Sequence, residues 1–252
     1  MIRVKDIYNY LNREIPFDTQ EKWDNSGLII GNIYTEVKTV AVMLDATVEN
    51  VEKAIKNNVD LIVTHHPIIF DPLKSVLKDD PIYNLVKQNI SLISVHTNWD
   101  KSEKGVNAVL TKVFELTDVK DLETEEGKGF VKYGTLSSTE PEGVFCELVK
   151  ERLKAPIVKY SSAHEAIRRV AVCGGAGADY IDEVADLVDA YVTSDIKYHQ
   201  FLHASEIGLT LIDAGHFSTE DISMGPLSLM LAQAFPDVKV LRLRSQDPVS
   251  YK

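Results

Sequence analysis

Two adjacent histidines, His65 and His66, follow a short apolar run over residues 61–64 that is typical of a buried strand. A protein core has little use for two neighbouring imidazoles, because each buried ring needs its own hydrogen-bond partner. A metal centre does use them, since histidine is the commonest metal ligand. Taken alone, the pair predicts either metal ligands or capped histidines at the surface or in a loop.

Further histidines and carboxylates follow other predicted strands: Asp45, His96, Asp100, His216 and Glu220. Side chains at the carboxyl ends of parallel strands converge on one edge of a sheet. A single His-x-x-x-Asp spacing is usually a helix-surface pair. Here, however, three clusters of histidines and carboxylates fall at equivalent strand ends, which favours a metal site. Their ligand types suit Zn, Fe, Mn, Co or Ni. Because one ion is saturated by three or four ligands, the set predicts two ions, with Glu220 as the bridge.

Two other segments are candidates for binding an anionic substrate. Gly174 and Gly175 lie between a predicted strand and a predicted helix, where backbone amides either cradle a phosphate or form a tight turn. The full G-x-G-x-x-G and the Walker lysine are missing. Lys197 and His199 follow the next strand, and we expect Lys197 to contact the substrate. His199, like His96, is a candidate for proton transfer. Trp23 and Trp99 are expected to be packing residues, with the alternative that they are platforms for a substrate.

Strands alternating with helices predict an α/β fold with a largely parallel sheet. The strands are expected over residues 38–45, 61–64, 90–95, 169–173, 190–193 and 209–213, and the helices over 47–57, 81–88, 106–114 and 180–188. The second half repeats the plan of the first, which indicates either two related lobes or the general similarity of βαβ units. We expect a first lobe over residues 1–120, completed by 221–252, and a second over 121–220, with a linker or hairpin at 120–134. The metal pair would lie in the cleft between the lobes.

Composition narrows the class of protein. The 252 residues carry a net charge of -11, which argues against a polymeric nucleic acid as partner. The two cysteines form neither a zinc pattern nor a disulfide framework, so a reducing compartment is expected. No run approaches the roughly 18 apolar residues of a membrane span. A cytoplasmic α/β protein with a small-molecule substrate and no membrane partner is the resulting prediction.

Several motifs occur together and in order along nearly the whole chain. They are Trp23-Asp24-Asn25-Ser26-Gly27-Leu28, Asp45-Ala46-Thr47, Thr64-His65-His66-Pro67, His96-Thr97-Asn98-x-Asp100, Gly105-Val106-Asn107, Cys173-Gly174-Gly175-Ala176-Gly177 and Asp213-Ala214-Gly215-His216-x-x-x-Glu220. This set resembles the Ngg-interacting-factor-three-like family, often labelled GTP cyclohydrolase I type 2 homologues, in its short form.

The resemblance implies two α/β lobes, a dinuclear metal site and a toroidal homohexamer. By motif, it implies as metal ligands His65, His66, Asp100, His216 and Glu220, with His96 beside the metals. The chain departs from the family at Trp99 and at Ser194-Asp195. The leading interpretation is a metal-dependent hydrolase of a small phosphorylated or nucleotide-like substrate. The alternatives are a metal-handling protein without turnover and a regulatory interaction protein whose metals serve structure.

Overall fold

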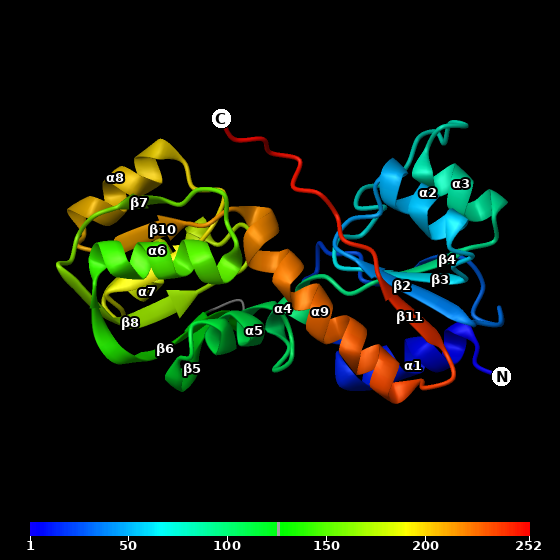
Figure 1. Cartoon of the computed structure of the whole chain (residues 1–252), viewed down its shortest axis with the longest axis horizontal. Helices are drawn as coiled ribbons and strands as arrows, with labels where there is room; N and C mark the ends of the chain where they lie inside the picture. The colour runs from blue at the N-terminus through cyan, green and yellow to red at the C-terminus, as the bar shows by residue number, and fades with distance from the viewer. Residues whose placement is uncertain (125–126) are drawn as a thin grey trace. The chain divides into compact units, whose positions relative to one another are not determined.

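The computed structural model describes residues 1–124 and 127–252, which divide into two compact units (Figure 1). The first unit comprises Met1–Trp99 and Ser223–Gln246, and the second comprises Asp100–Ile222 and Asp247–Lys252. Each unit combines a sheet with helices, so the α/β class is confirmed.

The units differ from the expected lobes mainly at residues 100–120, and also at 221–222 and 247–252, all of which belong to the second unit. Residues 100–120 belong there because their helix α5 (Val106–Val113) packs against strands β6 and β8 of the second sheet. A division based on the repeated strand–helix plan and the polar stretch at 120–134 could not anticipate that contact.

In the described part of the first unit, five strands form one sheet in the order β1-β4-β3-β2-β11. The bounds are β1 Gly27–Ile30, β2 Thr39–Met43, β3 Leu61–Thr64, β4 Ser91–Ser94 and β11 Lys239–Arg242. All neighbours are parallel except β1 and β4. The register pairs Met43 with Thr64 and Thr64 with Ser94. The three central strands therefore end level, and the residues that follow them leave the sheet at one edge.

Helices cover both faces of the first sheet. Their bounds are α1 Val4–Glu14, α2 Val48–Lys56, α3 Pro81–Lys87 and α9 His216–Ala234, with the turns η1 Phe17–Thr19 and α4 Thr97–Lys101. In Figure 1, α2 and α3 lie on one face, while α1 and the C-terminal part of α9 lie on the other. Helix α2 begins after Thr47, whose hydroxyl accepts from the amide of Asn50. Buried residues such as Met43, Ile62 and Leu85 form the core under α2 and α3.

In the described part of the second unit, six strands form a mixed sheet in the order β5-β6-β8-β9-β10-β7. The bounds are β5 Thr117–Thr124, β6 Gly127–Pro141, β7 Lys159–Ser161, β8 Ala166–Val172, β9 Ala190–Thr193 and β10 Thr210–Asp213. Only β8, β9 and β10 are parallel to one another, so the expectation of a largely parallel sheet is wrong for this unit. The predicted linker or hairpin forms β5 and β6, which pair antiparallel. Its Glu125 and Glu126 lie outside the described residues.

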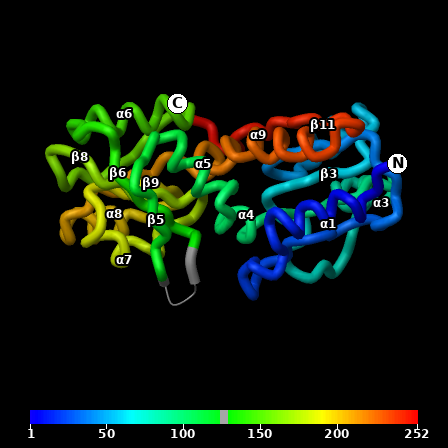
Figure 2. Tube along the Cα trace, turned by 90° about the horizontal axis from the view of Figure 1, so that it is seen from below, coloured from blue at the N-terminus to red at the C-terminus, as the bar shows by residue number. Residues whose placement is uncertain are grey.

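Helices also cover both faces of the second sheet. Their bounds are α5 Val106–Val113, α6 Glu142–Leu153, α7 Ile181–Ala185 and α8 Tyr198–Glu206, with the turn η2 Ala178–Tyr180. Figure 2 shows α6 on one side of the strands and α7 and α8 on the other. Val172, Val192 and Ile212 are in register, so this parallel triplet also ends level. Both units thus carry three consecutive parallel strands, which supports the interpretation of internal duplication.

Within residues 1–124 and 127–252, no helix combines the length and the apolar content that crossing a bilayer needs.

Candidate functional site

Three histidines come together at the carboxyl edge of the first sheet. His65 and His66 follow β3, and His96 follows β4. One ring nitrogen from each lies within 4.8 Å of the others. The ring centroids are 4.9 Å apart for His65 and His66 and 5.2 Å apart for His65 and His96. His65 is fully buried, and the other two are partly exposed.

The first two rings are oriented by oxygen acceptors. The Nδ1 of His65 lies 2.9 Å from the carbonyl oxygen of Val95, and the Nδ1 of His66 lies 2.6 Å from Oδ1 of Asp45. Since a carbonyl or carboxylate oxygen accepts, Nδ1 donates in both cases. The ring nitrogen with a lone pair is then Nε2, which is the atom that would bind a metal. Metal-binding histidines almost always have such an acceptor behind them.

His96 has the same arrangement through a buried carboxylate. Its Nδ1 lies 2.8 Å from Oδ1 of Asp24, whose side chain is inaccessible to solvent. Asp24 also accepts from the amide and hydroxyl of Thr97 and from the hydroxyl of Ser26. Burial alone would raise the pKa of Asp24. The hydrogen bonds from His96 and Thr97 outweigh burial and hold that pKa well below its usual range. Asp24 is therefore ionised and fixes the ring of His96.

His216 and Glu220 lie one turn apart at the start of α9, at the carboxyl edge of the second sheet. The Nε2 of His216 is 2.9 Å from Oε2 of Glu220, and its Nδ1 is 2.7 Å from Oδ2 of Asp195. Burial opposes protonation of His216, but Glu220 and Asp195 outweigh it and raise the pKa of the imidazole to about 9. Asp195 thus provides the acceptor behind Nδ1 of His216.

Two buried carboxylates meet beside this histidine. One oxygen of Asp100 lies within 4.8 Å of one oxygen of Glu220, and both residues are at least nine-tenths buried. The thiol of Cys173 is near both. Burial and the charge of Asp100 raise the pKa of this thiol well above its usual range. Without a metal ion, the thiol of Cys173 therefore stays protonated.

The glycine turn after β8 packs directly against Glu220. A Cβ on Gly175 would lie 2.2 Å from Oε1 of Glu220, and the φ of Gly175 is +64°. The amide of Gly174 donates to Oδ1 of Asn107, and that of Gly175 donates to Oγ1 of Thr219. Because these amides already donate within the protein, the geometry favours the tight turn. A phosphate-binding role for Gly174 and Gly175 stays a prediction.

Lys197 and His199 lie at the exposed start of α8. The backbone amide of Lys197 donates to Oε1 of Gln200, which fixes the first turn of the helix. The substrate-binding role of Lys197 and the proton-transfer role of His199 stay predictions.

The residues present fit a divalent metal. His65 and His66 each direct Nδ1 to an oxygen acceptor, which leaves Nε2 as the coordinating atom, whereas Nε2 of His216 faces Oε2 of Glu220. Imidazole together with buried carboxylate is a donor set for borderline ions. The first unit brings His65 and His66 together, and the second brings Asp100, His216 and Glu220 together. Each unit thus holds its own part of the predicted ligand set.

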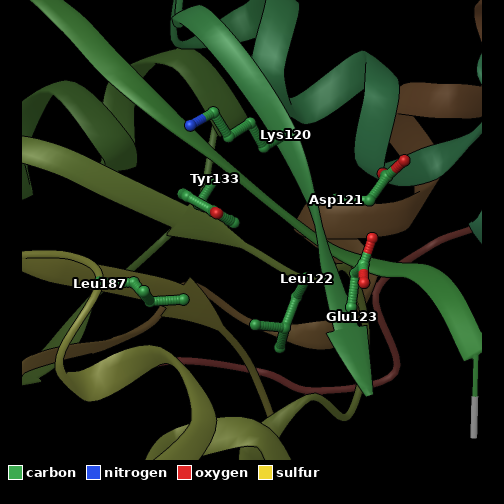
Figure 3. A pocket seen from close by; sticks show the side chains of 6 residues that line it. All are labelled: Lys120, Asp121, Leu122, Glu123, Tyr133 and Leu187. Atoms are coloured by element: carbon green, nitrogen blue, oxygen red, sulfur yellow. The ribbon is translucent and has the colours of Figure 1, made fainter. Parts of the chain in front are cut away.

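A separate cavity of about 470 Å³ lies in the second unit, between β5, β6 and the end of α7 (Figure 3). Its lining residues are Lys120, Asp121, Leu122, Glu123, Tyr133 and Leu187. None of the predicted site residues lines it. Asp121 is already paired with the buried Lys132. Because the lining combines charged and apolar side chains, the cavity indicates no particular ligand.

Comparison with known proteins shows what this arrangement is similar to. The model of the Duf34/NIF3 (NGG1p interacting factor 3) family matches residues 2–248. A Campylobacter jejuni protein named GTP cyclohydrolase 1 type 2 homolog is 35% identical over 224 residues, covering 87% of this chain and 88% of that protein. A Nostoc protein of the same name is 38% identical over 197 residues, covering 75% of each. The crystal structure of a hypothetical protein from Staphylococcus aureus matches with a TM-score of 0.92 at 28% identity, covering 99% of both chains. The chain therefore belongs to the Duf34/NIF3 family.

Proposed function

We propose that this chain is a cytoplasmic metal-dependent hydrolase of a small phosphorylated or nucleotide-like substrate. Two divalent ions would be held by His65, His66, Asp100, His216 and Glu220. The observation that carries the proposal is the acceptor oxygen behind the Nδ1 of each clustered histidine. The names of the relatives, GTP cyclohydrolase 1 type 2 homologs, support hydrolysis of a ring in a nucleotide-like molecule.

Glu220 and His96 have different proposed roles in hydrolysis. Two bound divalent ions would supply a hydroxide near neutral pH and polarise the bond to be cut. Glu220, with two oxygens in a buried position, is the proposed bridging ligand. His96 is held by the ionised Asp24, so its Nε2 is positioned to take a proton and the carboxylate stabilises the resulting imidazolium.

The charge of the chain bears on the kind of substrate. A net charge of -11 repels a large polyanion, whereas a single phosphate can be met by local cations such as Lys197. We therefore propose a small anionic molecule and not a polymeric nucleic acid. His199 is the second candidate for proton transfer.

A homohexamer is also part of the proposal, and it is supported by the family membership. Multi-angle light scattering of the purified chain tests it directly. A hexamer at micromolar concentration is the expected result, and a stable monomer would contradict it.

The decisive experiment on activity compares wild type with Asp100→Ala and His216→Ala on one panel of phosphoesters, nucleotides and cyclic amides, with added Mn or Zn. His203→Ala is the matched control, because His203 is also paired with a carboxylate, Asp182, but lies outside the cluster. We expect activity in wild type and in His203→Ala, and its loss in the other two variants. Activity that survives in both site variants would refute the proposal. Metal-loaded wild type without activity would favour a metal-handling protein.

A further inference from the structure

Two exposed aromatic side chains stand beside the histidine cluster of the first unit. Trp23 is 59% exposed and Phe70 is 48% exposed. Their ring centroids are 5.8 Å apart, with an angle of 44° between the rings. Single exposed hydrophobic residues are ordinary on protein surfaces, but a paired Trp and Phe at a polar site are not. From the sequence, both tryptophans are expected to be packing residues. Trp99 is buried, but Trp23 is exposed, so the expectation is wrong for Trp23.

The aromatic pair is continuous with the cluster through His96. The ring of His96 lies 6.1 Å from that of Trp23 and 6.2 Å from that of Phe70, edge-on to both at 73° and 81°. The ring of His96 is also 5.6 Å from that of His66. A molecule held against Trp23 and Phe70 would therefore be next to the histidines.

The backbone around both aromatic residues is held in place. Asp24, the neighbour of Trp23, is anchored by four hydrogen bonds to Ser26, His96 and Thr97. The side-chain amide of Asn25 donates to the carbonyl oxygen of Ile69, at 2.7 Å, and so ties the loop of Trp23 to the loop of Phe70. A backbone that is fixed before binding reduces the conformational entropy lost when a ligand contacts the rings it carries. This is the property of a preorganised binding surface.

We infer that Trp23 and Phe70 determine specificity by stacking against a planar heteroaromatic ring of the substrate. Aromatic faces stack on any nucleobase-like ring, and alanine substitution at such contacts costs about 1–3 kcal/mol, or roughly 5- to 150-fold in affinity. The inference rests on the proposed function, since it places the ring of that substrate beside the same histidines. It favours a substrate with an aromatic ring over a simple phosphate ester.

The test measures ring binding separately from catalysis, with full-length protein carrying its metal. The probes are guanosine, adenosine and uridine, which have a ring and no phosphate, and ribose 5-phosphate, which has a phosphate and no ring. Binding to wild type and Phe70→Leu is followed by tryptophan fluorescence, since Trp23 is the exposed one of the chain's two tryptophans. Because Trp23→Leu lacks this fluorophore, its nucleoside binding is measured by equilibrium dialysis. The control variant is Tyr34→Ala, which removes another exposed aromatic side chain of the first unit.

We expect at least one nucleoside to bind wild type and Tyr34→Ala equally, and to bind Trp23→Leu and Phe70→Leu about 10-fold more weakly. Metal content should be the same in all four proteins, because neither aromatic residue is a ligand. Equal nucleoside binding by all variants, or none by wild type, would overturn the inference. So would a change of oligomeric state in the Trp23 and Phe70 variants without a change in binding, which would assign the pair to a subunit interface. If nucleoside binding depends on Trp23 but the protein has no hydrolase activity, the proposed function is refuted and the inference about Trp23 and Phe70 stands.

Discussion

Replacing Gly175 by alanine should damage the metal site more than the fold. The added Cβ would lie 2.2 Å from Oε1 of Glu220, 3.2 Å from its Cδ and 3.3 Å from Cε1 of His216. The nearest atom is the far end of a flexible side chain, so the clash is relieved when the carboxylate retreats by about 1 Å or more. Glu220 would then leave the position in which it meets His216 and Asp100.

The cost to stability comes mainly from the backbone. Gly175 has a φ of +64°, a left-handed conformation that costs an L-residue about 1–2 kcal/mol. For a chain of this size, that cost lowers the midpoint of thermal unfolding by roughly 2–8 °C. Displacing a ligand or its support typically weakens metal affinity by about 10- to 100-fold. The variant should therefore remain folded at room temperature and bind metal poorly.

The assay pairs calorimetry of the metal-free protein with a Zn or Mn titration. Gly143→Ala is the matched control, because a Cβ at Gly143 meets nothing within 4 Å and the residue lies in the first turn of α6. The control should bind metal like wild type and unfold at the same or a slightly higher temperature. Unchanged metal affinity in Gly175→Ala would show that the close approach to Glu220 is not part of a metal site.

Three further outcomes follow from the structure. Asp45→Asn should weaken metal binding by about 10-fold, measured by competition with a chromophoric chelator, because it alters the acceptor behind His66. Asp195→Asn should do the same through His216, and full affinity in either variant would count against the orienting role. Glu142→Gln should lower the free energy of unfolding by about 1 kcal/mol at neutral pH. Burial would raise the pKa of Glu142, but hydrogen bonds from Ser162 and Thr210 outweigh it and lower that pKa below 4.5. The stabilisation is thus present above 4.5 and lost as the pH falls through the folded value, so urea unfolding should show the two proteins converging in acid; a constant difference would contradict it.

Local patterns in the sequence were sufficient for much of the fold and for the location of the candidate site. The parallel triplets β2-β3-β4 and β8-β9-β10 come from short apolar runs bounded by helices, which are strong signals. His65, His66 and His216 stand at the ends of these strands, so their place at a sheet edge follows from the topology. A hairpin was one of the two interpretations of the segment that forms β5 and β6, but the antiparallel pairing of β1 and β7 was not anticipated, since strand direction depends on pairing with distant segments.

The supporting contacts could not be found in the same way. Asp24 reaches His96 across 72 residues of sequence, and Asp195 reaches His216 across 21. No local periodicity encodes such pairs. Trp23 was misplaced for a related reason, because the sequence does not show whether a loop aromatic residue faces the core or the solvent. The amides of the glycine turn likewise find their acceptors on α5 and α9.

The stoichiometry of bound metal tests the central claim most directly. The full-length chain, purified without chelators and saturated with Zn or Mn, is analysed by inductively coupled plasma mass spectrometry beside Glu220→Ala, His65→Ala and His203→Ala. The account predicts two ions per chain in wild type and in His203→Ala, loss of both ions in Glu220→Ala, and loss of mainly one in His65→Ala. One ion or fewer in saturated wild type, or full occupancy in Glu220→Ala, would contradict it.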